Sequence, residues 1–386
     1  MKIFKTAGFI FFLANASFLH AADMYGVPDD DAAAIQNAFI SLFNEDFQNA
    51  DLLLEPLKPR AQKYPLIQTA IVVRHWWEMA SQVLENDVEA SKPFTTAADE
   101  CLAIAERAKK NKEQALLSLA TTLGLMSRWS AANRAWLAAY FRGTKAGEYA
   151  RRVLEEDKDA VDAYMTLGAF VYGKEKIRQS LSPNERPQNP EDMTPSILGL
   201  SHLEKAYQQG TYFKMPAGLL LAGILTNEKP LEAVPLLQEL REALPRSGFV
   251  HMLLLTALYN AGNGDELEKE IADFESNLNE QMYPPRYEAQ LHFAKGLAHF
   301  RKKEWRAAEA EFKTAYKSKD VKNPYVIWAH LYRGYALDAA KKREMARAEY
   351  RRVLALPRRF ASHDRARERL QKPFKSTDPE LKKLEV

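Results

Sequence analysis

The stretch that decides the fold runs from Gly296 to Leu356 and reads GLAHFRKKEWRAAEAEFKTAYKSKDVKNPYVIWAHLYRGYALDAAKKREMARAEYRRVLAL. It states one pattern twice, and every matched position keeps the same offset between the two copies. The matched pairs are Gly296 with Gly334, Ala308 with Ala346, Phe312 with Tyr350, and Ala315 with Val353. The offset is 38 residues, four more than the period of roughly 34 that is typical of arrays of paired helices. The stretch therefore predicts an all-α fold made of helix–turn–helix units.

Small residues in both copies indicate close contact between helices. A glycine in the first helix of each copy leaves room for a neighbouring helix that a larger side chain would block. In the second helix of the first copy, four residues are spaced by three, four and three positions and so share one face. They are Trp305, Ala308, Phe312 and Ala315. The alternation of small and large side chains on that face suits an interdigitating helix pair.

The second-helix rhythm returns along much of the chain. It occurs at Phe47–Leu57, Phe94–Ile104, Trp129–Ala139, Gly143–Val153, Gly199–Ala206, Pro230–Leu240 and Gly264–Phe274. We therefore predict an α-solenoid of about eight antiparallel helix pairs over residues 23–360, in which each unit contacts its neighbours. Residues 129–156 form either one long helix or two, and Gly143 favours a break between them.

These motifs resemble the tetratricopeptide repeat, which has a small residue early in its first helix and a small–aromatic–small pattern in its second. The first-helix pattern is clearest at Tyr164, Leu167, Gly168 and Tyr172. His292 and Lys295 depart from it, because the family usually has an aromatic residue and a leucine there. The resemblance covers roughly residues 30–360. It implies a right-handed superhelix whose concave face binds extended peptides or protein segments.

Residues 1–22 predict a cleaved signal peptide. Lys2 and Lys5 give a positive start, Ala7–Leu19 is an apolar stretch too short to span a membrane comfortably, and small residues follow at Ala21 and Ala22. We expect the mature chain to begin at Ala22 or Asp23 and to be periplasmic or secreted. The alternative is a membrane anchor that is never cut.

Charge and cysteine content argue against several classes of function. The formal charge is +3 for the whole chain, and removing Lys2 and Lys5 leaves +1. This near-neutral balance argues against a nucleic-acid-binding protein. Cys101 is the single cysteine, so the chain has no internal disulfide. Its place on the apolar face of Phe94–Ile104 favours a small buried side chain over a reactive thiol.

Two segments interrupt or close the predicted array. Residues 173–195 contain four prolines, so we expect Tyr172 to end one helix and a long proline-rich loop to follow, with a short helix at Lys174–Leu181 as an option. Loops of this length are either functional or disordered. Residues 361–386 are expected to form a capping helix at Asp364–Leu370 and then a charged tail.

The candidate binding surface consists of aromatic and histidine side chains. Trp76 and Trp77 point about 100° apart on one helix, so they are either two core residues or an aromatic platform for a ligand. His292 and His299 share a helix face, and His330 occupies the equivalent position of His292 one unit later. Equivalent sites in stacked helices are about 10 Å apart, so we interpret the three histidines as a polar lining and expect no metal site.

The sequence lacks a phosphate-binding glycine loop, an HExxH zinc motif and a G-x-S-x-G nucleophile turn. We therefore expect a non-enzyme without a cofactor: a scaffold that binds a protein or peptide partner in the cell envelope. The sequence is also similar to exported bacterial tetratricopeptide-repeat proteins. Some of these resemble periplasmic accessory subunits of tripartite transporters, which implies small-ligand binding as the alternative. Catalysis is a third option that no set of residues supports.

Overall fold

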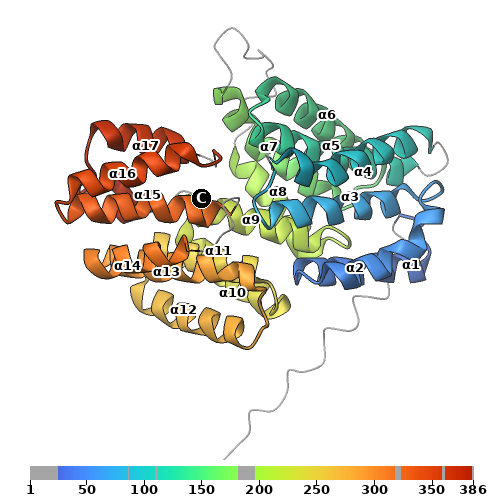
Figure 1. Cartoon of the computed structure of the whole chain (residues 1–386). Helices are drawn as coiled ribbons and strands as arrows, with labels where there is room; N and C mark the ends of the chain where they lie inside the picture. The colour runs from blue at the N-terminus through green and yellow to red at the C-terminus, as the bar shows by residue number, and fades with distance from the viewer. Residues whose placement is uncertain are drawn as a thin grey trace, which may run out of the picture.

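The computed structural model of the chain describes residues 25–85, 87–108, 112–180, 196–317, 323–358 and 361–384. Within these ranges the protein has seventeen α-helices, three short 3-10 helices and no β-strand (Figure 1). The all-α prediction is confirmed. The predicted signal peptide, residues 1–22, lies outside the described residues.

Most of the α-helices follow one another through short connections, whereas residues 181–195 separate α7 from α8. In chain order they are α1 (Asp29–Phe43), α2 (Phe47–Leu54), α3 (Pro65–Ala80), α4 (Val88–Arg107), α5 (Lys112–Ala132), α6 (Trp136–Glu156), α7 (Ala163–Ser180), α8 (Ser196–Gln209), α9 (Lys214–Glu228), α10 (Pro230–Ala243), α11 (Gly248–Ala261), α12 (Gly264–Asn279), α13 (Glu288–Arg301), α14 (Trp305–Ala315), α15 (Pro324–Ala339), α16 (Arg343–Ala355) and α17 (Ser362–Gln371). The 3-10 helices are η1 (Glu55–Arg60), η4 (Pro285–Tyr287) and η5 (Pro379–Leu381). Consecutive helices pack against each other as neighbours, most extensively α5 with α6, α7 with α8, and α13 with α14.

The repeated small residues lie where two helices meet. Phe312 packs directly over Gly296, and Tyr350 packs over Gly334, so that a β-carbon at either glycine would overlap the ring. Ala308 and Ala346 are fully buried. Both copies therefore bury an aromatic ring of the second helix against a glycine of the first, as the alternation of small and large residues predicts.

The turns within the units also repeat. Lys303 and Lys341, which occupy equivalent positions of the two copies, both have left-handed backbones, with φ of 63° and 62°. Gly262 (φ 82°) joins α11 to α12 in the same region of conformational space, and Arg134 (φ 61°) joins α5 to α6. A left-handed residue after a helix lets the last carbonyls accept hydrogen bonds while the chain reverses.

The Arg134 turn settles the division of residues 129–156. The break lies at residues 133–135, so Trp129–Ala139 is not one helix, and α6 then runs without interruption through Gly143 to Glu156. Gly143 does not break α6. Its missing side chain instead leaves space for Ser127 of α5 and Phe170 of α7.

The segment after Tyr172 differs from the expectation of a loop. α7 continues to Ser180, so residues 173–180 extend the helix, and α8 begins at Ser196. Residues 181–195, which hold the four prolines, lie outside the described residues. The predicted capping helix corresponds to α17, and the charged segment after it packs back onto the protein through buried Phe374, Leu381 and Leu384.

Helices α1–α3 contact a part of the chain that lies far away in sequence. The carboxylate of Glu45 accepts hydrogen bonds from the backbone N–H of Phe249 (3.1 Å), from the Tyr287 hydroxyl and from the Arg286 guanidinium. Beside it, the side-chain oxygen of Asn44 accepts from the backbone N–H of Arg246 at 2.9 Å. This group around Glu45 joins the α1–α2 turn to α11 and η4, so contacts are not limited to neighbouring pairs.

Candidate functional site

The two tryptophans of α3 are core residues. Trp76 and Trp77 expose 6% and 7% of their surface, too little for a ligand platform. Trp76 packs edge-on against Phe94, with the Arg128 guanidinium over its ring. Trp77 packs between Phe43 and Phe249 with ring centroids 5.0 and 4.9 Å away. Both faces of α3 are covered, which is why two adjacent tryptophans can be buried at once.

The three predicted histidines do not form one open lining, because each is paired with a glutamate. His292 of α13 donates from Nδ1 to Oε2 of Glu311 on α14 at 2.7 Å. His330 of α15 makes the same contact with Glu349 of α16 at 2.6 Å. His299 pairs across the α13–α14 turn with Glu304 at 2.6 Å and is the most exposed of the three. The imidazoles join helices rather than face a shared cavity.

A further histidine–glutamate pair joins the helices of the preceding unit. His251 of α11 is fully buried, and its Nε2 lies 3.1 Å from Oε2 of Glu270 on α12. Its Nδ1 lies 2.9 Å from the Tyr283 hydroxyl. Burial lowers the pKa of His251, so the neutral ring is favoured near pH 7. The three pairs 251/270, 292/311 and 330/349 share one spacing of 19 residues, and we call them the His–Glu pairs.

Sequence reasoning missed His251 and all three glutamates of the His–Glu pairs. The signal was present as the constant spacing between a histidine of the first helix and a glutamate of the second. A search for histidines alone does not show it, because the partner lies on another helix.

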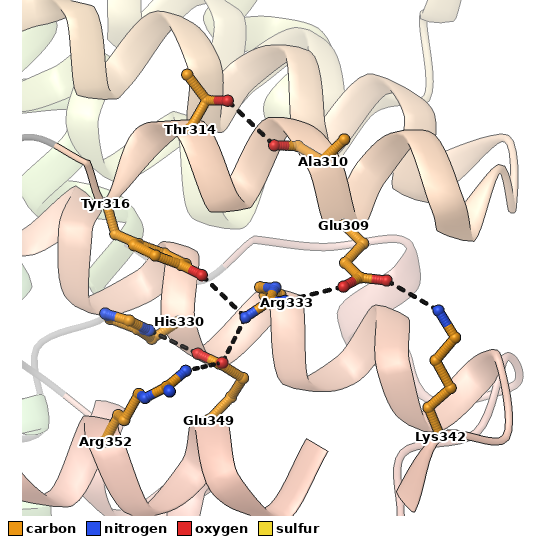
Figure 2. Close-up of polar contacts among 9 residues, drawn as sticks. All are labelled: Glu309, Ala310, Thr314, Tyr316, His330, Arg333, Lys342, Glu349 and Arg352. Carbon is orange, nitrogen blue, oxygen red and sulfur yellow. Dashed lines mark hydrogen bonds and ion pairs between the residues drawn. The ribbon is translucent and has the colours of Figure 1, made fainter. Parts of the chain in front are cut away.

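The pair in the last unit belongs to a larger charged network (Figure 2). Arg333 of α15 donates to Glu349 (2.5 Å), to the Tyr316 hydroxyl (2.8 Å) and to Glu309 of α14 (2.9 Å). His330 stacks on Tyr316 with centroids 4.1 Å apart and planes 12° apart. Arg352 and Lys342 complete the network by pairing with Glu349 and Glu309.

Glu349 is ionised in this network. Burial alone would raise the pKa of Glu349, but the hydrogen bond from His330 and the charge of Arg333 together outweigh it, so the pKa lies below its ordinary value. The carboxylate is shared among His330, Arg333 and Arg352, and it lies in the contact between α15 and α16. Such a carboxylate stabilises helix packing and is not poised to move a proton to a substrate.

An open groove lies elsewhere, between η1, α3 and α4. Its volume is about 760 Å³. Apolar side chains form its floor, including Ile71, Ala97 and Ile104. Charged and polar side chains form its rim: Lys58, Gln62, His75, Glu89, Lys92, Glu100 and Arg107. We call this feature the α3–α4 groove.

The α3–α4 groove has the chemistry of a binding surface. Gln68, at its floor, donates to Glu100 at 3.2 Å and to the Ala97 carbonyl at 3.5 Å, which fixes the separation of α3 and α4. Burial, and then the charge of Arg74, lowers the pKa of His75, so the rim imidazole is neutral near pH 7. An apolar floor bounded by charges of both signs suits an amphipathic segment better than a single small anion or cation.

Comparisons with protein-family models and with curated proteins gave no match for the chain. Over the described residues, no cluster of three or more His, Cys, Asp or Glu side chains is arranged to hold a metal ion. None of the helices in those ranges combines the length and the apolar character that crossing a membrane requires.

Proposed function

We propose that this chain is an exported, non-catalytic scaffold of the tetratricopeptide-repeat type, an α-solenoid that binds a protein or peptide segment in the cell envelope. The α3–α4 groove is the observation that carries the proposal. It combines a buried apolar floor with an exposed rim that holds three cations and two anions. A helix or peptide with an apolar stripe and mixed flanking charges would bury its stripe on that floor.

The histidine-bearing helices support a structural role for the rest of the array. In the described residues, His292, His299 and His330 each have a carboxylate partner. Arg333 donates to the Glu349 and Glu309 carboxylates and to the Tyr316 hydroxyl, so two buried or half-buried carboxylates already offset its charge. These groups favour rigid pairing of the helices within α13–α16.

Site-directed photo-crosslinking tests the groove. Thr96 lines the α3–α4 groove and is exposed, whereas Asp99 is exposed on the same helix but outside the lining. A photoreactive residue at Thr96 should capture a specific protein in a cell-envelope fraction, and the same residue at Asp99 should not. Ala103→Arg, which fills the groove from an exposed position, should reduce capture at Thr96 severalfold. Equal labelling from both positions would show that the groove is not the binding surface.

Export is tested separately by sequencing the N-terminus of the protein recovered from the periplasm or medium. We expect Ala22 or Asp23 as the first residue, because the charged, apolar and small-residue regions stand in signal order. An intact Met1 on the recovered protein would contradict this.

A small ligand is the second candidate, since about 760 Å³ falls within the range of small-molecule sites. It predicts a bound compound in native mass spectra of protein purified from the cell. Ala103→Arg would remove that mass while leaving the protein folded.

A further inference from the structure

The segment Lys372–Leu384 lies along the carboxyl ends of three first helices, α11, α13 and α15, which stand side by side (Figure 1). It contributes three apolar side chains that are almost fully buried: Phe374 (2% exposed), Leu381 (6%) and Leu384 (1%). The residues that receive them form a docking strip, which consists of Tyr259, Asn260, Phe300, Arg301, Tyr335 and Asp338.

One end of the docking strip accepts an aromatic ring. Phe374 stacks on Tyr335 with centroids 4.9 Å apart and planes 17° apart, and it also contacts Phe300 at 5.4 Å. The Arg369 guanidinium lies 5.5 Å from the same ring. The backbone N–H of Phe374 donates to Oδ2 of Asp338 at 2.9 Å, so the strip recognises both the ring and the backbone beside it.

The other end of the strip forms hydrogen bonds with backbone groups of residues 381–384. Asn260 accepts from the N–H of Leu384 at 2.7 Å and donates to the carbonyl of the same residue at 3.1 Å. The Tyr259 hydroxyl donates to the Leu381 carbonyl at 2.8 Å, and Arg301 donates to the Lys382 carbonyl at 3.2 Å. A side-chain amide that holds both backbone groups of one residue recognises a peptide whatever its side chains are.

Most residues between Phe374, Leu381 and Leu384 are exposed. Lys375, Ser376 and Thr377 face solvent, as do Lys382 and Lys383. Contact therefore depends on three apolar positions, on backbone groups and on the Asp378 carboxylate, which pairs with Arg369 of α17 at 2.7 Å. This is how proteins bind short linear segments, in which a few anchors fill pockets and the rest tolerates substitution.

We propose that the docking strip is a peptide-binding site that the chain's own residues 374–384 occupy, and that a partner segment with a phenylalanine followed by leucines seven and ten positions later replaces them. The proposal rests on the proposed scaffold function and assigns a partner chemistry to a surface distinct from the α3–α4 groove. A tethered segment acts at an effective concentration of about 1 mM. A free peptide with a dissociation constant of about 10 µM would thus bind the intact chain about 100-fold more weakly than the vacated strip.

The experiment uses the full mature chain with a protease site inserted between Lys372 and Pro373, both exposed and just beyond α17. After folding, cleavage leaves the segment held without a covalent bond. The probe is a fluorescent synthetic peptide of residues 372–386, and its anisotropy is measured before and after cleavage and gel filtration. We expect binding to strengthen about 100-fold on cleavage, with the released segment recovered in the low-mass fraction.

Two substitutions test the geometry in the cleaved protein. Asn260→Ala should weaken peptide binding about tenfold, because it removes both hydrogen bonds to Leu384. Asn227→Ala is the matched control. Asn227 lies at the nearby end of α9 and donates to Gly223 of its own helix at 3.3 Å, so its loss should leave peptide binding unchanged.

Three results would overturn the proposal: a cleaved segment that stays bound and does not exchange with excess peptide, a vacated strip that fails to rebind the peptide, or loss of the cooperative melt on release. Each would make the segment a permanent part of the fold. Capture through Thr96 reports on the α3–α4 groove independently. A failure of the strip with capture intact therefore leaves the scaffold function standing, and failure of both removes it.

Discussion

The C-terminal units α13–α16 and the N-terminal helices α1–α3 both depend on a buried glutamate, but each uses it over a different distance in the chain. Glu349 binds His330 and Arg333, 19 and 16 residues away, within one helix pair. Glu45 binds Phe249, Tyr287 and Arg286, between 204 and 242 residues away. The Glu349 contacts join the two helices of one pair. The Glu45 contacts join the α1–α2 turn to α11 and η4, which are far away in sequence.

The difference bears on how helices that are distant in sequence are held together. A chain of helix pairs held only by neighbours unfolds in parts, because each unit has its own stability. The contacts of Glu45 and of the Trp77–Phe249 ring pair couple α1–α3 to α11 and η4. We infer that a substitution of Glu45 destabilises both α1–α3 and α11, whereas a substitution inside α13–α16 destabilises those helices alone.

The largest effect is expected from Glu45→Ala, which leaves the Arg286 charge, the Tyr287 hydroxyl and the Phe249 N–H without their acceptor. Removing one partner of a buried ion pair lowers the free energy of unfolding by about 3–5 kcal/mol. Alanine is the suitable replacement because Glu45 has a left-handed backbone (φ 64°), and glycine would relieve that conformation at the same time.

Urea unfolding followed by circular dichroism measures the Glu45→Ala effect, and hydrogen exchange shows where it falls. Faster exchange should appear in both α1–α2 and α11. Glu55→Ala is the control, since Glu55 and its partner Lys58 are both exposed and the loss of such a pair should cost less than about 1 kcal/mol. Equal stability of the two variants would mean that the Glu45 contacts do not hold the regions together.

The next effect concerns the repeat itself. Ala346→Leu and Ala308→Leu should each destabilise the C-terminal units by about 1–3 kcal/mol, because the added atoms enter a contact that only a small residue fits. Hydrogen exchange should rise in α13–α16 and remain unchanged in α1–α3. Ala310→Leu, at an exposed position of α14, serves as the control. An unchanged melting curve for both buried substitutions would show that the repeat has been misplaced.

These two predictions also mark what the sequence could reveal. The glycine–aromatic contacts of Gly296 and Gly334 were predictable because both partners lie inside one short repeat. The contacts of Glu45 and Leu384 were not, because partners more than a hundred residues apart leave no periodic pattern. Trp76 and Trp77 were left undecided because a helix covered on both faces shows no polar side. The predicted end of α7 lies about two turns too early, because the prediction treats all of residues 173–195 as proline-rich. The first proline is Pro183, so no proline interrupts the helix before Ser180.

Acidification should separate two of the His–Glu pairs. The pKa of His251 is lowered below 6.5 by burial, so the folded state keeps this ring neutral while the unfolded chain gains a proton. The stability it contributes is present above pH 6.5 and is lost as the pH falls through its folded pKa. The pKa of Glu349 lies below 4.5, so its contribution is present above pH 4.5 and is lost only on further acidification.

We therefore expect α11–α12 to loosen at a higher pH than α15–α16, as measured by hydrogen exchange after equilibration at a series of pH values. Glu349→Gln should flatten the pH dependence of α15–α16 below pH 4.5 and leave that of α11–α12 intact. Simultaneous loosening of both units in the wild-type chain would contradict separate titration of the two pairs.

The smallest effect is expected where the chain departs from the repeat, between α7 and α8. Residues 181–192 lie between the end of α7 at Ser180 and the start of α8 at Ser196, so replacing them with a short Gly/Ser segment leaves both helices in place. Loop-closure entropy changes slowly with loop length, so the free energy of unfolding should shift by less than about 1 kcal/mol. Thermal melting measures this shift, and capture at Thr96 then shows whether binding needs the segment. A large drop in melting temperature would instead make residues 181–192 a structural clamp, comparable to Glu45 in joining parts of the chain that the repeat does not connect.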